Sequence, residues 1–259
     1  MGSLESRAER TAQVIWSAWT GGYLLTELPE EIRPADASAG WVAQRALAEH
    51  AGPHYGYKIA ATSKAGQAHI GVDGPLTGML FDRFRRDPGA VLPSANLSMR
   101  VVEAEFAFRM SCDVTGGATA GEVIDAVDSL HLAIEVPDSR FEHFDRVGEA
   151  VLLADVACAC WFVLGAEVPG WRELDLRTAE TELWINGECT AVGVGGNALG
   201  DPHAALVWVA SELERCGSGL RAGDVITTGT TTVPPMVGPD DQVRAEFGPL
   251  GSVALSFAR

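Results

Sequence analysis

Residues 101–110, VVEAEFAFRM, show the strict alternation of a β-strand, and this stretch restricts the fold more than any other part of the chain. Successive side chains of a strand point to opposite faces, so Glu103 and Glu105 share one face. The other face is apolar and consists of Val102, Ala104, Phe106 and Phe108. Since an apolar face needs other apolar groups to pack on, we expect this strand to lie against the protein core.

Glu103 and Glu105 are also candidate metal ligands. Carboxylates two residues apart on a strand are roughly 6.5–7 Å apart, near enough to reach one hard cation, and they repel each other unless something positive lies between them. A third acid, Glu135, lies in the apolar run LHLAIEVPDSR, where burial of a lone charge would be costly. We therefore predict that the three glutamates bind one divalent metal. The alternative is an ordinary solvated face, but the hydrophobic surroundings of all three acids favour the metal site.

A lysine interrupts a second predicted strand. The stretch YGYKIAATS, residues 55–63, is strand-like and carries Lys58 in its interior. Such a lysine can extend its stem to solvent or pair with an acid. It can also serve as a cation held in a pocket, with a pKa that responds to burial and to a nearby metal. The residues alone leave these interpretations open.

The first part of the chain is predicted to be helical. Residues 4–27 place apolar side chains three or four positions apart, and Asp36 is a suitable N-cap for a second helix over residues 37–50. A chain of 259 residues can form one large domain, or one domain with a helical preface, and can bury a sizeable core. We expect a helical N-terminal region, 1–52, followed by a domain that comprises 53–259.

Charge and cysteine content restrict the partners and the compartment. The formal net charge of −16 argues against nucleic acid or an anionic membrane as a partner and favours a soluble protein that acts on small molecules. No apolar run is long enough to span a bilayer, and no signal peptide precedes the first acidic residues. The five cysteines are odd in number and form no C-x-x-C, so we expect a cytoplasmic protein. Cys158 and Cys160 lie in so apolar a run that core positions are favoured over a zinc pair.

The opening residues, MGSLES, match the loose pattern for N-myristoylation at Gly2. A single acyl chain anchors a protein only weakly, and no basic patch follows to reinforce it. A fortuitous match is therefore the preferred interpretation.

The rest of the chain reads mainly as strands and turns. A helix is expected before the Glu135 strand, and residues 150–165 are predicted to form another long apolar strand or a pair of strands. Asn186-Gly187, between two alternating runs, is a strong signal for a two-residue hairpin. Because strands dominate and helices lie at the edges, the predicted fold class is α+β around a mostly antiparallel, rolled sheet.

One spacing matches the dinucleotide-binding fingerprint, namely Gly193-x-Gly195-x-x-Ala198. That motif needs a single strand that leads into the helix of a βαβ unit, whereas a hairpin is predicted before these glycines. We therefore reject a dinucleotide site. Asp201 and Pro202 are instead a suitable N-cap and first residue for a helix that extends to Cys216.

Several segments, in this order, resemble the 2-keto-4-pentenoate hydratase and 4-oxalocrotonate decarboxylase group of the fumarylacetoacetate hydrolase superfamily. The segments are GYKIAATSK, GVDGPLTGMLF, VEAEFAF, AIEVPDSR, FVLG, NGE, LGDPHAALVWVASEL, AGDVITTG and GPLGSV. The resemblance covers nearly the whole chain. It implies the rolled β-structure of that superfamily with a helical N-terminal region, and it makes 53–259 the catalytic domain. It also implies that Glu103, Glu105 and Glu135 bind magnesium and that Lys58 is the active-site lysine.

The resemblance also suggests which residues surround the metal. The expected substrate-binding residues are Thr62, Ser63, Leu76, Val156 and Cys158. Asp138 and Arg140 lie close to Glu135 in the sequence and are expected to support the ligands from behind. Ligation by oxygen alone favours Mg²⁺, with Mn²⁺ able to substitute, and no organic cofactor is expected.

Departures from the group's pattern distinguish between its activities. Hydratases usually carry an acid in a P-D-x-G pattern after GVD, but this chain has Leu76 there, and an aliphatic side chain cannot act as acid or base toward water. The segments VPDSRFEHF and TTGTTTVPPMV also resemble the decarboxylase branch more closely. The usual A-D-N-A-S is ADVAC here, so Val156 and Cys158 replace polar residues. If they face the pocket, a larger or less polar 2-oxo acid from a specialised pathway is expected.

The resemblance thus implies metal-dependent decarboxylation of an unsaturated 2-oxo dicarboxylic acid such as 2-oxohex-3-enedioate (4-oxalocrotonate), in the catabolism of aromatic compounds. The first alternative is hydration of 2-hydroxypenta-2,4-dienoate. The second is hydrolysis of a carbon–carbon bond in a β-diketone-like acid, for which only His54 and His69 are candidate bases. A non-catalytic subunit is the third. The expected partners are a small 2-oxo acid and further copies of the chain in a homo-oligomer, or a related family member.

Overall fold

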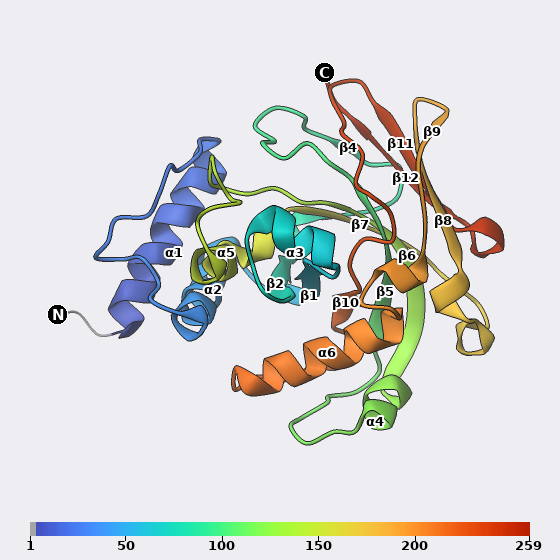
Figure 1. Ribbon diagram of the computed structural model, residues 1–259, viewed down its shortest axis with the longest axis horizontal. Helices are drawn as coiled ribbons and strands as arrows, with labels where there is room; N and C mark the ends of the chain where they lie inside the picture. Colours follow the sequence, from blue (N-terminus) through green and yellow to red (C-terminus); the bar gives the residue numbers. More distant parts are fainter. Residues whose placement is uncertain (1–3) are drawn as a thin grey trace.

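A computed structural model describes residues 4–259, and its strands form two sheets that pack together (Figure 1). The larger sheet has seven strands in the order β2-β1-β10-β5-β6-β7-β3. Its strands are β1 (His54–Ala60), β2 (Leu76–Phe81), β3 (Arg85–Arg86), β5 (Glu103–Met110), β6 (Val127–Val136), β7 (Trp161–Glu167) and β10 (Val225–Thr227). The smaller sheet has the order β4-β12-β11-β8-β9. It consists of β4 (Val91–Leu92), β8 (Glu180–Ile185), β9 (Glu188–Val194), β11 (Gln242–Glu246) and β12 (Ser252–Phe257).

Most neighbouring strands are antiparallel, as the sequence predicts. The parallel pairs are β1 with β10, β3 with β7, and β4 with β12. Strands β5 and β6 lie near the middle of the larger sheet, and β6 is long and strongly curved (Figure 1). The predicted α+β class with a mostly antiparallel, rolled sheet is confirmed.

Six α-helices flank the sheets in the described part of the chain. They are α1 (Leu4–Gly21), α2 (Ala37–Ala51), α3 (Lys64–Ile70), α4 (Ala120–Asp125), α5 (Glu149–Ala154) and α6 (Pro202–Arg215). The N-terminal helices α1 and α2 lie at one side of the molecule, next to α5, and α6 runs below the sheet in the same view (Figure 1). Between residues 4 and 259, the structure contains no helix that is both long and apolar enough to cross a bilayer.

Both predicted N-terminal helices form, but the first ends at Gly21 and not at residue 27. Helix α2 is joined by hydrogen bonds to the larger sheet. Asp36 caps α2 by accepting a hydrogen bond from the amide of Ala39 at 2.9 Å. Further along α2, the buried amide of Gln44 donates to the carbonyl of Thr77 and accepts from the amide of Met79 in β2. Apolar residues of both helices belong to the same core cluster as the sheet. The domain boundary after residue 52 stays a prediction, and Gly2 lies outside the described residues.

Residues 150–165 differ from the predicted strand. The first part forms helix α5, a short 3₁₀ turn, η2 (Val156–Cys158), follows, and only the end belongs to strand β7. This segment is apolar on all sides because it is buried on all sides, and such a run does not distinguish a buried helix from a buried strand. The prediction of one or two strands over this stretch was therefore wrong for its first half.

The hairpin and the helix after it form as predicted. Asn186 and Gly187 have φ values of 53° and 85° between β8 and β9, which is the backbone of a two-residue hairpin turn. Of the fingerprint glycines, Gly193 lies near the end of strand β9 of this hairpin, and Gly195 begins the short 3₁₀ turn that follows. Asp201 then caps α6 by accepting from the amide of His203 at 2.8 Å. The arrangement is not a βαβ unit, which agrees with the rejection of a dinucleotide site.

Candidate metal centre

The pairing of β5 with β6 brings the three predicted glutamates together. Glu103 lies directly opposite Glu135 in the antiparallel register, and Glu105 lies two residues further along the same face. Each of the three offers a carboxylate oxygen, and these oxygens all lie within 4.8 Å of one another. Glu105 and Glu135 are fully buried, and Glu103 is partly exposed. The acidic face of β5 is thus turned into the protein, not toward solvent.

The buried carboxylates accept few hydrogen bonds from the described residues. Glu105 Oε2 accepts a hydrogen bond from the amide of Gly229 at 3.2 Å, but Glu105 Oε1 has no hydrogen-bond partner within residues 4–259. Glu135 accepts no well-directed hydrogen bond on either oxygen from those residues. Buried polar oxygens without partners are rare and costly. Oxygen-only donors of this kind fit a hard divalent cation such as Mg²⁺.

Burial and mutual repulsion disfavour the charged forms of the three acids. Burial raises the pKa of Glu105 well above its ordinary value, and the nearby Glu135 and Glu103 raise it further. Burial also raises the pKa of Glu135, to about 7, although Lys58 opposes that shift. The pKa of Glu103 is raised by burial too, again against the effect of Lys58. One lysine does not balance three carboxylates, and a divalent cation would.

Without a metal, the protein is expected to become less stable as the pH rises from about 4.5 to about 7. Glu135 titrates near 7 in the folded protein and near its ordinary value of 4.5 when unfolded, so the folded state holds an extra proton between these values. The stability gained from that proton is present below the window and is lost as the pH rises through it. A sample with chelator should therefore melt at a lower temperature at about pH 8 than at about pH 5.5. Magnesium should remove most of this difference, and an equal pH dependence in both samples would count against the site.

Lys58 lies beside the acids and is not an extended, solvent-reaching lysine. Its side chain is buried, and in β1 it pairs across to Gly78 of β2. Nζ lies 3.1 Å from Glu135 Oε1, and it donates a hydrogen bond of 3.1 Å to the carbonyl of Ala157. Burial lowers the pKa of Lys58, but the carboxylates, Glu135 foremost, outweigh burial and raise it overall. Lys58 is therefore a charged ammonium group held between the acids and the η2 turn.

The predicted substrate-binding residues take different positions. Thr62 is buried against the backbone of Gly229, the residue whose amide contacts Glu105. Leu76 and Cys158 belong to one small apolar cluster beside α5. Ser63, in contrast, is exposed, and its hydroxyl caps α3 by accepting from an amide of that helix.

Val156 is buried in the main core cluster. Burial raises the pKa of the Cys158 thiol to about 12, so this cysteine is a neutral thiol at neutral pH. The replacement of the usual polar residues at these two positions thus adds apolar surface around the η2 turn. Whether their side chains contact a substrate stays a prediction.

Asp138 and Arg140 are both buried, but their hydrogen bonds lead away from the glutamates. Asp138 Oδ1 accepts from the amide and hydroxyl of Ser98, each at 2.8 Å, and from the amide of Met99 at 2.9 Å. Arg140 forms a buried ion pair with Asp155. Asp155 was not among the predicted site residues. Its sequence signals are that it is a lone acid within an apolar run and that it occupies the position of the acid in the usual A-D-N-A-S segment, which reads ADVAC here.

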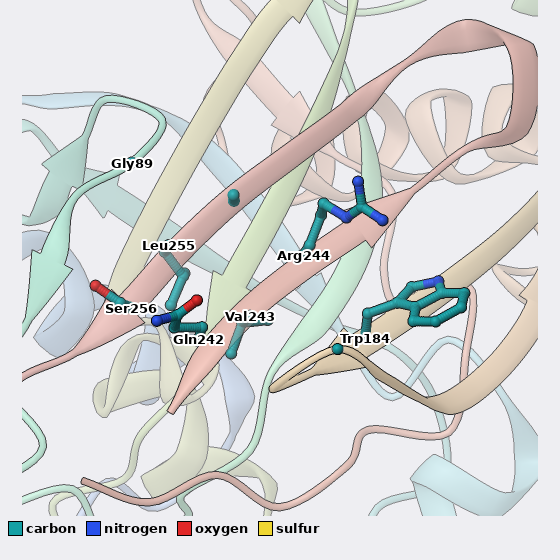
Figure 2. Close-up of a pocket in the computed structure, with 9 residues that line it drawn as sticks. Gly89, Trp184, Gln242, Val243, Arg244, Leu255 and Ser256 are labelled. Atoms are coloured by element: carbon teal, nitrogen blue, oxygen red, sulfur yellow. The ribbon is translucent and has the colours of Figure 1, made fainter. Parts of the chain in front are cut away.

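A cavity of about 490 Å³ is lined by none of the residues of this site. It lies on the smaller sheet, between β8, β11, β12 and the loop at Gly89 (Figure 2). Figure 2 shows Trp184 and Arg244 extending from neighbouring strands, and Arg244 pairs with Glu246. This cavity has no cluster of buried ionisable groups, so its size alone does not make it the functional site.

A comparison with models of protein families identifies the family of this chain. The model described as fumarylacetoacetate (FAA) hydrolase C-terminal matches residues 74–257. The chain belongs to the fumarylacetoacetate hydrolase family. The matched segment contains all three glutamates and begins after Lys58.

Two groups of relatives within the fumarylacetoacetate hydrolase family are similar to this chain. The 4-oxalocrotonate decarboxylase of Pseudomonas putida is 33% identical over 229 residues, which cover 88% of this chain and 86% of that protein. The 2-keto-4-pentenoate hydratase 1 of Dechloromonas aromatica (strain RCB) is 31% identical over 255 residues, which cover 96% of this chain and 97% of that protein.

A solved structure of the family is also similar in fold. The 4-oxalocrotonate decarboxylase from Pseudomonas putida G7, complexed with magnesium and adipate, superimposes with a TM-score of 0.89 at 29% sequence identity. The match covers 97% of each chain. The fumarylacetoacetate hydrolase-like fold with its N-terminal helices, expected from the sequence, is confirmed.

Proposed function

We propose that this protein is a lyase that removes carbon dioxide from an unsaturated 2-oxo dicarboxylic acid of the 2-oxohex-3-enedioate type, with Mg²⁺ as its cofactor. The observation that carries the proposal is the convergence of three carboxylates, with oxygens within 4.8 Å of one another, beside the buried ammonium group of Lys58, which lies 3.1 Å from Glu135. The solved decarboxylase that is similar in fold holds magnesium and adipate, a dicarboxylate with as many carbons as 2-oxohex-3-enedioate. Manganese is expected to substitute, and the reaction needs no organic cofactor.

The three glutamates would hold the metal. Glu103 and Glu135 face each other across β5 and β6, while the amide of Gly229 fixes Glu105. When bound, a divalent cation supplies positive charge that favours a chelating 2-oxo acid and offsets negative charge on its 2-oxo oxygen.

Lys58 is proposed to act on the same oxygen. Loss of carbon dioxide breaks the bond between C5 and C6, and the electron pair moves along the conjugated chain to the 2-oxo oxygen. That oxygen then takes a proton, which gives 2-hydroxypenta-2,4-dienoate. An ammonium group has three N–H donors, and two of those on Lys58 face Glu135 and the carbonyl of Ala157. We propose that the third donates to the developing enolate.

The apolar cluster around Leu76 and Cys158 supports decarboxylation over addition of water. Neither an aliphatic side chain nor a thiol with a pKa of about 12 can activate water at neutral pH. Hydration of 2-hydroxypenta-2,4-dienoate is nevertheless the second candidate, because hydratases of the family match almost the full length of this chain.

The test offers the purified protein 2-oxohex-3-enedioate with magnesium, then with excess chelator, and follows release of carbon dioxide. In parallel, the protein receives 2-hydroxypenta-2,4-dienoate, and its disappearance is followed. Metal-dependent release without loss of the dienoate is the expected result. Loss of the dienoate alone would identify a hydratase, and no reaction with either compound would contradict both candidates.

The cellular setting follows from the same proposal. All five cysteines are free in the described structure, which suits a reducing cytoplasm. We propose a role in the catabolism of aromatic compounds, as a homo-oligomer or together with a related family member. We also propose that residues 1–52 form a helical region attached to a catalytic domain over 53–259.

A further inference from the structure

The η2 turn beside Lys58 has an unusual backbone. Val156, Ala157 and Cys158 have φ values of 47°, 50° and 63°, so three consecutive residues other than glycine adopt the left-handed region. Each such residue is strained relative to a right-handed conformation, because its Cβ lies close to the following carbonyl oxygen. A turn of this kind persists only where surrounding groups hold it in place.

Arg140 supplies that support, because its guanidinium group spans both ends of the turn. At the start, Nε pairs with the carboxylate of Asp155 and Nη2 donates to the carbonyl of the same residue. At the end, Nη1 donates to the carbonyl of Ala159 at 2.9 Å. The ring of Trp19 in α1 covers the guanidinium group, and Arg140 Cζ lies 4.0 Å from the centre of that ring.

The second carboxylate oxygen of Asp155 also accepts hydrogen bonds. Asp155 Oδ2 accepts from the hydroxyl of Ser139 at 2.8 Å and from the amide of Arg140 at 3.1 Å. The turn is also fastened at its far side, where the amide of Asp138 donates to the carbonyl of Cys158 at 2.9 Å. The loop at 138–140 therefore determines the path of the turn.

The η2 turn directs one carbonyl group toward Gly78 in β2 and another toward Lys58 in β1. The carbonyl of Val156 lies so close to Gly78 that a Cβ there would be 1.9 Å from its oxygen, so only glycine fits. Gly78 is the cross-strand partner of Lys58. The next carbonyl along the turn, that of Ala157, accepts the hydrogen bond from Lys58 Nζ.

We propose that Arg140, through Asp155 and the left-handed turn, is a positioning residue for Lys58. The guanidinium group fixes the Ala157 carbonyl, and that carbonyl holds the ammonium group at its place beside Glu135. The effect on turnover rests on the function proposed above, whereas the effect on the position of Lys58 does not. This role differs from the one expected from the sequence, in which Arg140 supports the metal ligands, because here Arg140 acts on Lys58.

The test replaces Arg140 by lysine. Arg140→Lys keeps a positive charge beside Asp155, but one ammonium group cannot donate in a fork to both Asp155 and the distant Ala159 carbonyl. We expect kcat to fall roughly tenfold to a hundredfold, as for a misplaced catalytic group, while KM and the Kd for Mg²⁺ each change less than about threefold. A merely structural role would lower the melting temperature without this selective loss of kcat.

Arg172→Lys is the matched control. Arg172 also lies over a tryptophan ring, that of Trp171 at 4.4 Å, and also donates to a backbone carbonyl, that of Val127. Neither of these contacts among the described residues involves the η2 turn, so kcat should stay at the level of the unaltered protein. If Arg140→Lys does not fold, Trp19→Leu keeps the buried ion pair and removes the ring over the guanidinium group, together with the stacking of that ring on Phe84. A smaller fall in kcat in the same direction is then expected.

Crystal structures of the unaltered protein and of Arg140→Lys, or of Trp19→Leu in its place, provide a measurement that does not depend on activity. The separation of Lys58 Nζ from the Ala157 carbonyl should exceed hydrogen-bonding distance in the variant. An unchanged separation would overturn the proposal, as would an unchanged kcat in an active protein. If the unaltered protein turns over neither test compound, the proposed function fails, and the separation alone still decides whether Arg140 positions Lys58.

Discussion

A Glu105→Gln variant is expected to lose nearly all metal-dependent turnover and to remain folded. Glutamine has the same shape and keeps a carbonyl oxygen that can accept from the Gly229 amide, so the local packing is preserved. It removes one of the three charges that would hold the cation. We expect the Kd for Mg²⁺ to weaken roughly a hundredfold or more, measured by calorimetric titration, with a parallel loss of kcat/KM.

The same substitution should stabilise the protein when no metal is present. Glu105 is fully buried, and both burial and the neighbouring acids disfavour its charge. A neutral amide relieves that repulsion, so in chelator the variant should melt at a higher temperature than the unaltered protein at about pH 8. Glu180→Gln, on an exposed position of β8, is the control and should change neither property. Undiminished turnover in Glu105→Gln would remove the metal centre from the mechanism.

The alternation of β5 could be read from the sequence, but not what covers its two faces. Glu103 and Glu105 project from one face as predicted, and the partner in the register is Glu135. A period of two residues shows which side chains share a face, and the hydrophobic surroundings of the acids pointed to burial. Burial of the acidic face itself results from the curvature of the sheet and from strands that are far away in the sequence. These are tertiary effects that no local pattern contains.

Segments without a periodic signal were the ones predicted less well. Residues 150–165 are buried on all sides, so the helix at their start has no polar stripe that would reveal its period. The left-handed turn at Val156–Cys158 contains no glycine, asparagine or aspartate, the residues that usually mark such a backbone. The sequence marks Asp155 as an acid in an apolar run and in the ADVAC segment, but its pairing with Arg140 became visible only in the folded chain.

A Lys58→Met variant is expected to lose roughly 10²–10⁴-fold in kcat, the range typical for removal of a proton-transferring group. Methionine fills much of the same volume, so the buried site between β1 and the η2 turn should not collapse. Glu135 loses the cation at 3.1 Å, and its pKa should rise further when no metal is present. The variant therefore separates the role of the lysine from that of the carboxylates.

Binding of Mg²⁺ by Lys58→Met should be retained or become tighter. The ammonium group and a metal ion are both positive and would both lie beside Glu135, so removal of one relieves repulsion with the other. Lys64 is the only other lysine of the chain, lies exposed on α3, and contacts Gln67. Lys64→Met should therefore match the unaltered protein in both kcat and Kd. If Lys58→Met lost its affinity for Mg²⁺ along with its turnover, the lysine would be a structural partner of the acids. If the variant kept its turnover, the proton that the 2-oxo oxygen takes would have to come from another group.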